Sequence, residues 1–255
     1  MPSATNWRVV LEYDGAAFNG WQSQPQGRCI QDVVEHALSR LLGGEAVTVH
    51  ASGRTDAGVH ALGQVCSFRA HADRPPERML AGLNALLPPD VSCLEATPAP
   101  PDFHARFSAT GKRYRYVIRV GPGRSALRRG RCWPIHWPLD VSAMEDALRR
   151  LVGRLDFTSF RAAGCSASSP VRTVDQMALL QVDDELHIEV HGEGFLRHMV
   201  RNIVGSAVDV GLGKRPPSWF DELIDRRDRS LAGRTAPGAG LYLVEVDYPA
   251  TLTRS

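Results

Sequence analysis

Apolar positions in the first hundred residues follow two spacings. Hydrophobic residues recur at every second position over residues 7–13, 46–52, 64–70 and 90–96, which predicts four strands. Helical spacing predicts helices over 30–42 and 76–87. The first helix is the clearer, since Gly43 can end it in a left-handed conformation and its apolar residues share one face. These residues are Ile30, Val33, Val34, Ala37, Leu38, Leu41 and Leu42.

The second half of the chain repeats this succession. Strand spacing covers 112–120, 171–181, 186–191 and 240–248, and helical spacing covers 144–152 and 195–210. Ser142 and Glu145 have the spacing of a capping box at the start of the first of these helices.

Both halves therefore follow the order β-α-β-β-α-β, which is that of a ferredoxin-like unit. We expect an α+β protein of two tandem ferredoxin-like units, whose antiparallel sheets flank a central cleft. The predicted domains are residues 1–105 and 106–255.

Composition limits the class of protein and the cellular compartment that we expect. The chain has 255 residues, 43% of them hydrophobic, and a net charge of +2, which is ordinary for a globular protein with a buried core. It has no apolar run of about 18 residues and no hydrophobic leader near Met1, so we expect a cytoplasmic protein without membrane contact. Five cysteines without close pairing argue against disulfides and structural zinc.

Basic residues are concentrated in one span. It contains no carboxylate, and its cations include Lys112, Arg113, Arg115, Arg124, Arg128, Arg129 and Arg131. Such a span is either a phosphate-binding surface or a solvated face, and the pattern alone leaves both readings open.

The clearest candidate for chemistry is the run from Gly53 to His60. It places Asp56 two residues after Arg54, among small residues, between two predicted strands, where catalytic groups are often mounted. A solvated Arg-x-Asp ion pair worth under about 1 kcal/mol is the plain alternative. In the second half, Arg172 and Thr173 repeat Arg54 and Thr55, but Val174 replaces the aspartate. A single acid does not suit hydrolysis by two carboxylates.

The string ASGRTDAGVHALGQV, from Ala51 to Val65, closely resembles the signature of the TruA family of tRNA pseudouridine synthases. Further matches follow in order along nearly the whole chain: Tyr13-Asp14-Gly15, Gly20-Trp21-Gln22, Phe103 to Ala109, Lys112 to Tyr116, Asp156 to Phe160, His198 to Gly205 and Gly240 to Leu243.

This resemblance implies isomerisation of uridine to pseudouridine in tRNA without a cofactor. It makes Asp56 the essential carboxylate, which either attacks ribose C1′ or removes a ribose proton, and Arg201 its guanidinium partner. The target nucleotide would be flipped out of its stem. Arg54 would fill the vacated space or bind a neighbouring phosphate, Tyr114 would stack on the base, and Leu241 would close the pocket wall.

The predicted catalytic residues are thus Asp56, Tyr114 and Arg201. Those predicted to bind substrate are Arg54, Leu241, His60 and Lys112, and the RNA backbone is expected to contact Arg113, Arg115, Arg128, Arg129 and Arg131. Resemblance to the family also points to positions 38 to 40 of the anticodon arm and to a homodimer.

Three alternatives differ from this interpretation. The first is an RNA-binding protein without catalysis, built from two ferredoxin-like units, and the second is a related synthase that acts on another RNA. The third is a metal site formed by His187, Glu189 and His191, but polar residues that alternate with Leu186, Ile188 and Val190 are typical of the solvent side of a strand. We therefore expect no metal.

Overall fold

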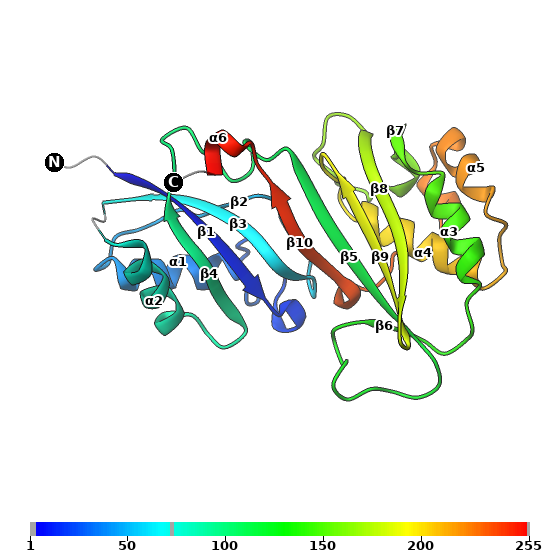
Figure 1. The fold of residues 1–255 in the computed structure, drawn as a ribbon, viewed down its shortest axis with the longest axis horizontal. Helices are drawn as coiled ribbons and strands as arrows, with labels where there is room; N and C mark the ends of the chain where they lie inside the picture. Colours follow the sequence, from blue (N-terminus) through cyan, green and yellow to red (C-terminus); the bar gives the residue numbers. More distant parts are fainter. Residues whose placement is uncertain (1–3, 72–73, 254–255) are drawn as a thin grey trace. The chain divides into compact units, whose positions relative to one another are not determined.

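The computed structural model describes residues 4–71 and 74–253 and contains two compact units (Figure 1). One unit comprises Met1–Thr110 with Leu243–Ser255, and the other comprises Gly111–Tyr242. Each is a mixture of helices and mostly antiparallel strands. The chain is therefore an α+β protein.

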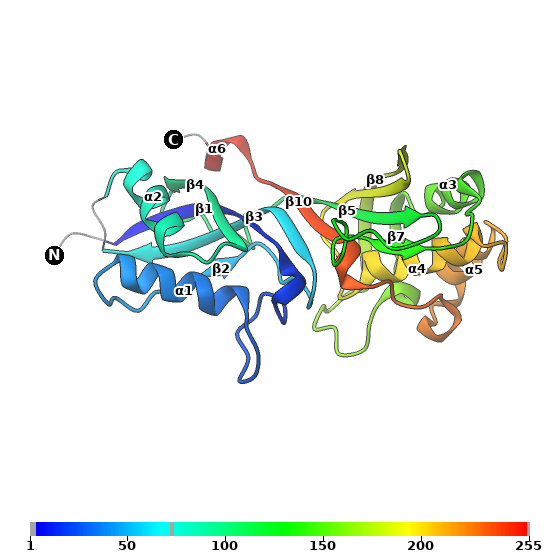
Figure 2. The same cartoon turned by 90° about the horizontal axis from the view of Figure 1, so that it is seen from below.

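The first unit contains strands β1 (Thr5–Tyr13), β2 (His50–Ala51), β3 (His60–Ala70) and β4 (Val91–Pro98), and most of β10 (Leu241–Asp247). Strand β1 pairs in antiparallel fashion with both β3 and β4, and β2 pairs with β3. Helices α1 (Ile30–Leu41) and α2 (Pro76–Leu86) contact each other, and α1 lies along one face of these strands (Figure 2). A short helix, α6 (Ala250–Thr253), follows β10.

The core of the first unit explains the alternating pattern of its strands. Trp7 of β1 and Phe68 of β3 are opposite each other in the strand register and stack at 6.5 Å between ring centroids. Both are almost fully buried, as are Ile30, Val34 and Leu38 of α1. Burial of large side chains at alternate strand positions, each worth about 1.5–3 kcal/mol, fixes the register.

The strand predicted over 46–52 is much shorter in the structure. Only His50 and Ala51 form a ladder with β3. The backbone N–H of Val49 instead donates to the Glu35 carboxylate of α1 at 2.9 Å. A side chain has therefore taken a backbone donor that the strand would have used, which the hydrophobic pattern does not show.

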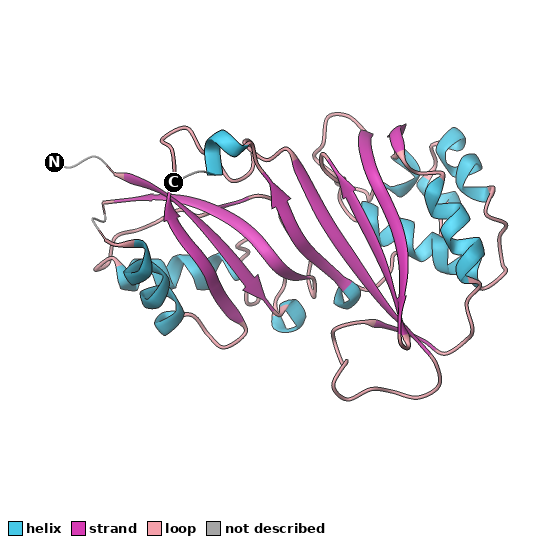
Figure 3. Ribbon diagram, in the orientation of Figure 1, coloured by secondary structure: helices cyan, strands magenta, loops and turns pink. Residues whose placement is uncertain are grey.

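The second unit is built on β5 (Gly111–Val120), β9 (Glu185–Gly192), β8 (Val171–Val182) and β7 (Gly153–Asp156), adjacent in that order. Their pairs are antiparallel, and the short β6 (Trp133–Ile135) runs parallel to β5. Helix α3 (Val141–Arg149) contacts α4 (Met199–Gly211) and α5 (Trp219–Arg226), and the three form one group of helices (Figure 3). Strands β6 and β7 and helices α5 and α6 were not predicted, because all are short.

Two predicted helix starts are wrong. Helix α3 begins at Val141 and is capped by Asp140, whose carboxylate accepts the Ala143 N–H at 2.9 Å, so Ser142 lies inside the helix and forms no capping box. The helix predicted from residue 195 begins at Met199. His198 has φ 61°, a left-handed conformation that a helix cannot continue through.

Helix α4 is almost wholly buried, and a glycine lets another chain segment cross it closely. A Cβ added to Gly205 would lie 1.7 Å from the carbonyl oxygen of Arg234. Ala236 donates its N–H to the carbonyl of Arg201 at 3.1 Å on the same helix. Residues 234–236 therefore lie directly on α4.

We predict that Gly205→Ala destabilises the protein by at least about 2 kcal/mol, because the clash is with backbone that cannot move aside easily. Gly194→Ala is the matched control, since an added Cβ there has open space, and its effect should stay within about 0.5 kcal/mol. Urea unfolding measures both. Equal stability of the two variants would contradict the close crossing.

Candidate active site

Asp56 lies in the loop between β2 and β3. Its side chain is half-buried, and its carbonyl accepts the Val59 N–H at 3.1 Å, which closes a tight turn. Gly58 in this turn has φ 75°, a conformation that glycine adopts without strain. The loop therefore has a defined shape around the carboxylate.

A buried polar network holds the start of this loop. The hydroxyl of Tyr13 lies 2.8 Å from that of Thr55, and Gln64 donates to the Gly53 carbonyl at 2.9 Å. Ser52 donates to the Gln64 amide oxygen at 2.6 Å. Buried polar groups that satisfy one another make a region rigid, because breaking any one bond leaves an unpaired group.

The other support of the loop is the segment that follows β1. A Cβ added to Gly15 would lie 2.0 Å from the Val59 carbonyl, and one added to Gly20 would lie 2.6 Å from the Thr55 carbonyl. Backbone bonds join the two segments, from Trp21 N–H to the Thr55 carbonyl at 3.0 Å and from Gly58 N–H to the Phe18 carbonyl at 3.2 Å. The aspartate loop is thus fixed to β1 as well as to β3.

His60 is buried below this loop. Its Nδ1 lies 3.1 Å from the Gly15 nitrogen and 3.2 Å from an Asp14 carboxylate oxygen. A ring nitrogen that accepts the Gly15 N–H has no proton to donate to Asp14, so the two contacts belong to different tautomers of the ring. With either tautomer His60 joins the two segments that shape the loop. Its predicted contact with substrate stays a prediction.

Arg54 contrasts with these neighbours, because its side chain is exposed. Thr55 points inward to Tyr13 while Arg54 points to solvent. Alternation along this short extended stretch therefore presents a guanidinium at the surface two residues before Asp56.

In the second unit, Tyr114 and Lys112 lie on β5, opposite Val190 and Gly192 of β9. The Tyr114 ring is half-buried and meets the ring of Phe195 edge-on, at 5.2 Å and 85°. This contact fixes the ring from one side.

Tyr116 has a different environment from Tyr114. It is fully buried, its hydroxyl donates to the Pro237 carbonyl at 2.8 Å, and burial raises its pKa. A Cβ added to Gly240 would lie 2.6 Å from its ring, so Gly240 lies flat against it. Tyr116 thereby fixes the segment that leads into Leu241.

Arg201 and Leu241 are attached to the two ends of this same segment. Arg201 Nε donates to the Ala236 carbonyl at 2.8 Å, and Ala236 returns a backbone bond to the Arg201 carbonyl. Leu241 is buried at the start of β10. Within the second unit, the structure thus anchors Arg201 and Leu241 through one segment, residues 236–240.

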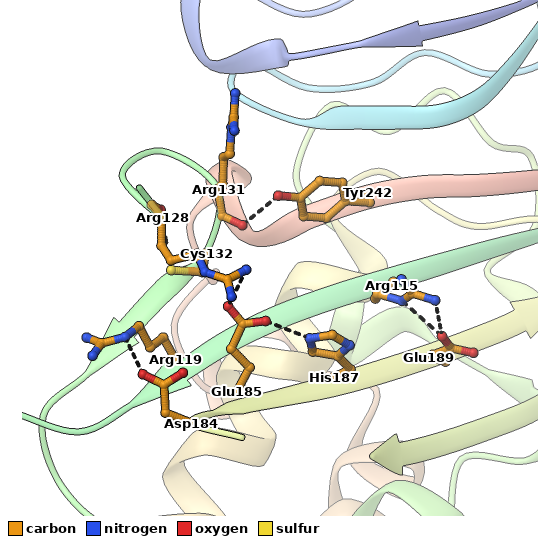
Figure 4. A network of polar contacts seen from close by, with 10 residues as sticks. All are labelled: Arg115, Arg119, Arg128, Arg131, Cys132, Asp184, Glu185, His187, Glu189 and Tyr242. Carbon is orange, nitrogen blue, oxygen red and sulfur yellow. Dashed lines mark hydrogen bonds and ion pairs between the residues drawn. The ribbon is translucent and has the colours of Figure 1, made fainter. Parts of the chain in front are cut away.

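The basic span is partly neutralised by acids from elsewhere in the sequence (Figure 4). Arg115 forms two hydrogen bonds with Glu189, at 2.7 and 2.9 Å, and Arg119 pairs with Asp184 at 2.6 Å. Arg128 lies 3.0 Å from Glu185. The absence of carboxylates within the span was therefore a misleading signal, because β9 and the turn before it supply them.

Glu185 is the centre of this network. It is buried, one carboxylate oxygen lies 2.9 Å from His187 Nε2, and the other meets the Arg128 charge without the geometry of a hydrogen bond. Close by, the Tyr242 hydroxyl donates to the Arg131 carbonyl at 2.6 Å. Arg128 thus holds the loop after β5 in place, while Arg124 and Arg129 are exposed on it. Arg113 donates to Gln176 at 3.2 Å.

The residues weighed as a metal site have separate partners. His187 contacts Glu185, Glu189 contacts Arg115, and His191 lies 3.2 Å from Asp175. In the described part of the chain, no three His, Cys, Asp or Glu side chains gather as metal ligands would.

Sequence reasoning missed Glu185 and the buried network around Thr55. A buried glutamate next to apolar Leu186 has no distinctive pattern in a single sequence. The network could have been suspected, because Tyr13, Thr55 and Gln64 all belong to the matching motifs, but their contact depends on the register of β1 and β3.

Comparison with known proteins agrees with these motifs. The profile of the family described as "tRNA pseudouridine synthase" matches residues 9–108 and 147–249. A tRNA pseudouridine synthase A from Chromobacterium violaceum is 46% identical over 94% of this chain and 91% of its own length. Proteins of the same description from Ralstonia nicotianae and Geobacter sulfurreducens are each 47% identical, over 96% and 94% of this chain and 90% and 98% of their own lengths.

The chain therefore belongs to the tRNA pseudouridine synthase family. It is an enzyme, an isomerase that acts on tRNA. Over residues 4–71 and 74–253, no helix has the length and apolar character needed to cross a bilayer.

Two neighbouring arginines of the loop after β5, here called the basic loop, should differ in their effect on stability: Arg128, which pairs with Glu185, and Arg129, which is exposed. Arg128→Ala leaves the buried Glu185 carboxylate without its cation, and we expect a loss of roughly 1–2 kcal/mol. This is below the range for a fully buried pair because the Arg128 side chain is half exposed. Arg129→Ala, an exposed neighbour, should stay within about 0.5 kcal/mol.

A second variant separates charge from packing. Glu185→Gln added to Arg128→Ala removes the unpaired charge and should recover part of the lost stability in urea unfolding. Equal effects of Arg128→Ala and Arg129→Ala would show that the ion pair between Arg128 and Glu185 does not stabilise the loop.

Proposed function

We propose that this enzyme converts uridine to pseudouridine at positions 38 to 40 of the anticodon arm of tRNA. The bond between ribose C1′ and uracil N1 breaks, the base turns, and C1′ joins C5. The proton that leaves C5 is replaced by one on N1, so the reaction needs no external reagent and no cofactor. The observation that carries the proposal is the family match, which covers both the Asp56 loop and helix α4.

Asp56 is the proposed essential carboxylate. The support from the structure is that its loop is fixed by the buried network around Thr55 and by close backbone contact with residues 15–21. A carboxylate that attacks C1′ or removes a ribose proton must be held in place before the substrate arrives, because orientation lowers the barrier. Attack on C1′ and removal of a ribose proton both require that the Asp56 loop be held rigidly.

The remaining catalytic set is proposed from the second unit. Tyr114 stacks on the flipped uracil, since its ring is fixed by Phe195 and still partly exposed. Arg201 is the guanidinium that favours the ionised aspartate in the reaction, and its support is the hydrogen bond that fixes it to Ala236. Leu241 forms an apolar wall for the base.

Base flipping gives a role to Arg54, the exposed residue two positions before Asp56. A uridine stacked in a stem cannot reach a carboxylate, so it must be extruded at a cost of a few kcal/mol. Arg54 takes the vacated space or binds a neighbouring phosphate. Lys112 and His60 complete the proposed substrate contacts, and Arg113, Arg115, Arg128, Arg129 and Arg131 the proposed backbone contacts.

The domain architecture, the cellular compartment and the oligomeric state are also proposals. Two ferredoxin-like domains, residues 1–105 and 106–255, have support from the element order of each half and from the pairing of β1 with β3 and β4. The compact units differ from these bounds in placing Leu243–Ser255 with the first. We further propose that the enzyme is cytoplasmic and works as a homodimer.

Tritium release tests the reaction directly. On a tRNA transcript labelled at uridine C5, the wild-type protein should release tritium without added metal, and a chelator should not slow it. Release restricted to transcripts with uridine at positions 38 to 40 is expected. An RNA-binding protein without catalysis would release none, and a synthase for another RNA would release it only from that RNA.

Asp56→Asn should abolish detectable release while tRNA affinity stays within about tenfold, because the carboxylate acts in the transition state and phosphate contacts dominate binding. Tyr114→Phe keeps the ring and should bind tRNA better than Tyr114→Ala. Substantial release by Asp56→Asn would mean that another group is the acid.

The salt dependence of tRNA binding tests the basic loop. Arg129→Ala combined with Arg131→Ala should weaken binding and flatten the log-log salt slope by roughly one unit for each lost phosphate contact. Arg128 is left intact because it holds the loop. A double variant with the affinity and slope of the wild type would identify the loop as a solvated face.

A further inference from the structure

Three rings, two exposed and one half-buried, lie next to one another on the first unit, outside the residues assigned so far. His50 at the start of β2 lies 5.0 Å from His104, and His104 lies 4.4 Å from Phe107, between ring centroids. His50 is exposed and the Phe107 side chain is 77% exposed. We refer to His50, His104 and Phe107 as the ring cluster. Adjacent rings at the surface, as distinct from a single exposed apolar residue, form a candidate binding surface.

The turn that carries two of these rings is held rigidly. His104 Nδ1 accepts the N–H of Arg106 at 3.0 Å and that of Phe107 at 3.4 Å, so the imidazole is locked against its own turn. The Ser108 hydroxyl accepts the His104 N–H at 3.0 Å. Phe107 is therefore presented on a preformed support, which lowers the entropy lost on binding.

Buried anchors fix this turn to the body of the unit. Ala105 is fully buried and donates its N–H to the Ser67 hydroxyl of β3 at 3.0 Å. The Tyr248 hydroxyl donates to the Ala105 carbonyl at 2.5 Å, and the Phe103 and Tyr248 rings lie 5.1 Å apart. Residues 103 and 105 thus point inward while residues 106 and 107 face solvent. Phe107 has the same parity as residues 103 and 105 but faces solvent, because the chain turns here and the Ser108 N–H bonds back to the His104 carbonyl at 3.0 Å.

The charges around the ring cluster suit an anionic ligand with flat faces. The Arg106 guanidinium lies 5.7 Å from the Phe107 ring centroid. Burial, followed by the nearby His50 and Arg106, lowers the pKa of His104, which favours the neutral ring. Phenyl, imidazole and guanidinium faces are the groups on which proteins stack unpaired RNA bases.

We propose that the ring cluster binds an unpaired base of the tRNA substrate by stacking, with Arg106 on the adjoining phosphate. This site rests on the proposed function, since tRNA is its ligand, but it is separate from the chemistry at Asp56. A second copy of this chain is the other occupant that such a surface could take. Adjacent flat rings with a cation beside them match the stacked bases and linking phosphates of single-stranded RNA, and this favours RNA.

Affinity measurements test the site first. Phe107→Ala should weaken binding of full-length protein to tRNA by about 5- to 150-fold, the range for loss of one stacked base. The salt slope should not change, because no charge is removed. Phe107→Trp keeps a flat ring and should retain affinity. Leu94→Ala, at another exposed apolar residue of the first unit, is the control and should have no effect.

Turnover separates this proposal from the proposed function. In the tritium assay, Phe107→Ala should raise KM and leave kcat near that of the wild type. If the wild-type protein releases no tritium, the proposed function fails. If it is active and Phe107→Ala binds tRNA as tightly as the wild type, only the ring cluster is overturned.

Crosslinking identifies the occupant. With p-benzoylphenylalanine in place of Phe107, irradiation in the presence of tRNA should give a protein–tRNA adduct that ribonuclease removes. A protein–protein adduct instead would assign the cluster to contact between two copies. Absence of any adduct would also overturn the proposal.

Discussion

Close backbone contact between two chain segments is the constraint on which the candidate site depends. Residues 15–21 lie against residues 55–59 without intervening side chains, which is possible only because Gly15 and Gly20 have none. The hydrogen bonds of Trp21 and Gly58 then join the segments as neighbouring strands are joined. The position of the Asp56 loop therefore depends on these two glycines.

Glycines also allow close contact between chain segments in the second unit. Gly205 lets residues 234–236 cross helix α4, and Gly240 lies flat against the buried Tyr116 ring. Between these two points, the segment receives hydrogen bonds from Arg201 and Tyr116. In both units a loop acquires precision from contact with a packed element and not from its own conformational preference.

Much of this architecture could be predicted from the sequence, because long helices and strands have a clear periodic spacing of apolar residues. The helix over 30–42 and the strands at 64–70 and 112–120 are examples. Short or unusual features could not be predicted. Glu35 binds the backbone at Val49, His198 adopts a left-handed conformation, and Glu185 is buried beside Arg128. The two contacts depend on partners elsewhere in the sequence, and the conformation of a single residue leaves no periodic pattern, so periodicity reveals none of the three.

The first unit is discontinuous, with the whole second unit inserted between Thr110 and Leu243. The backbone of Thr110 bonds to Asp247, and Tyr248 bonds to the turn at Ala105. The ribosome therefore synthesises the whole second unit before the segment that closes the first unit. A chain stalled in translation before Leu243 would consequently carry the Asp56 loop on an incomplete first unit.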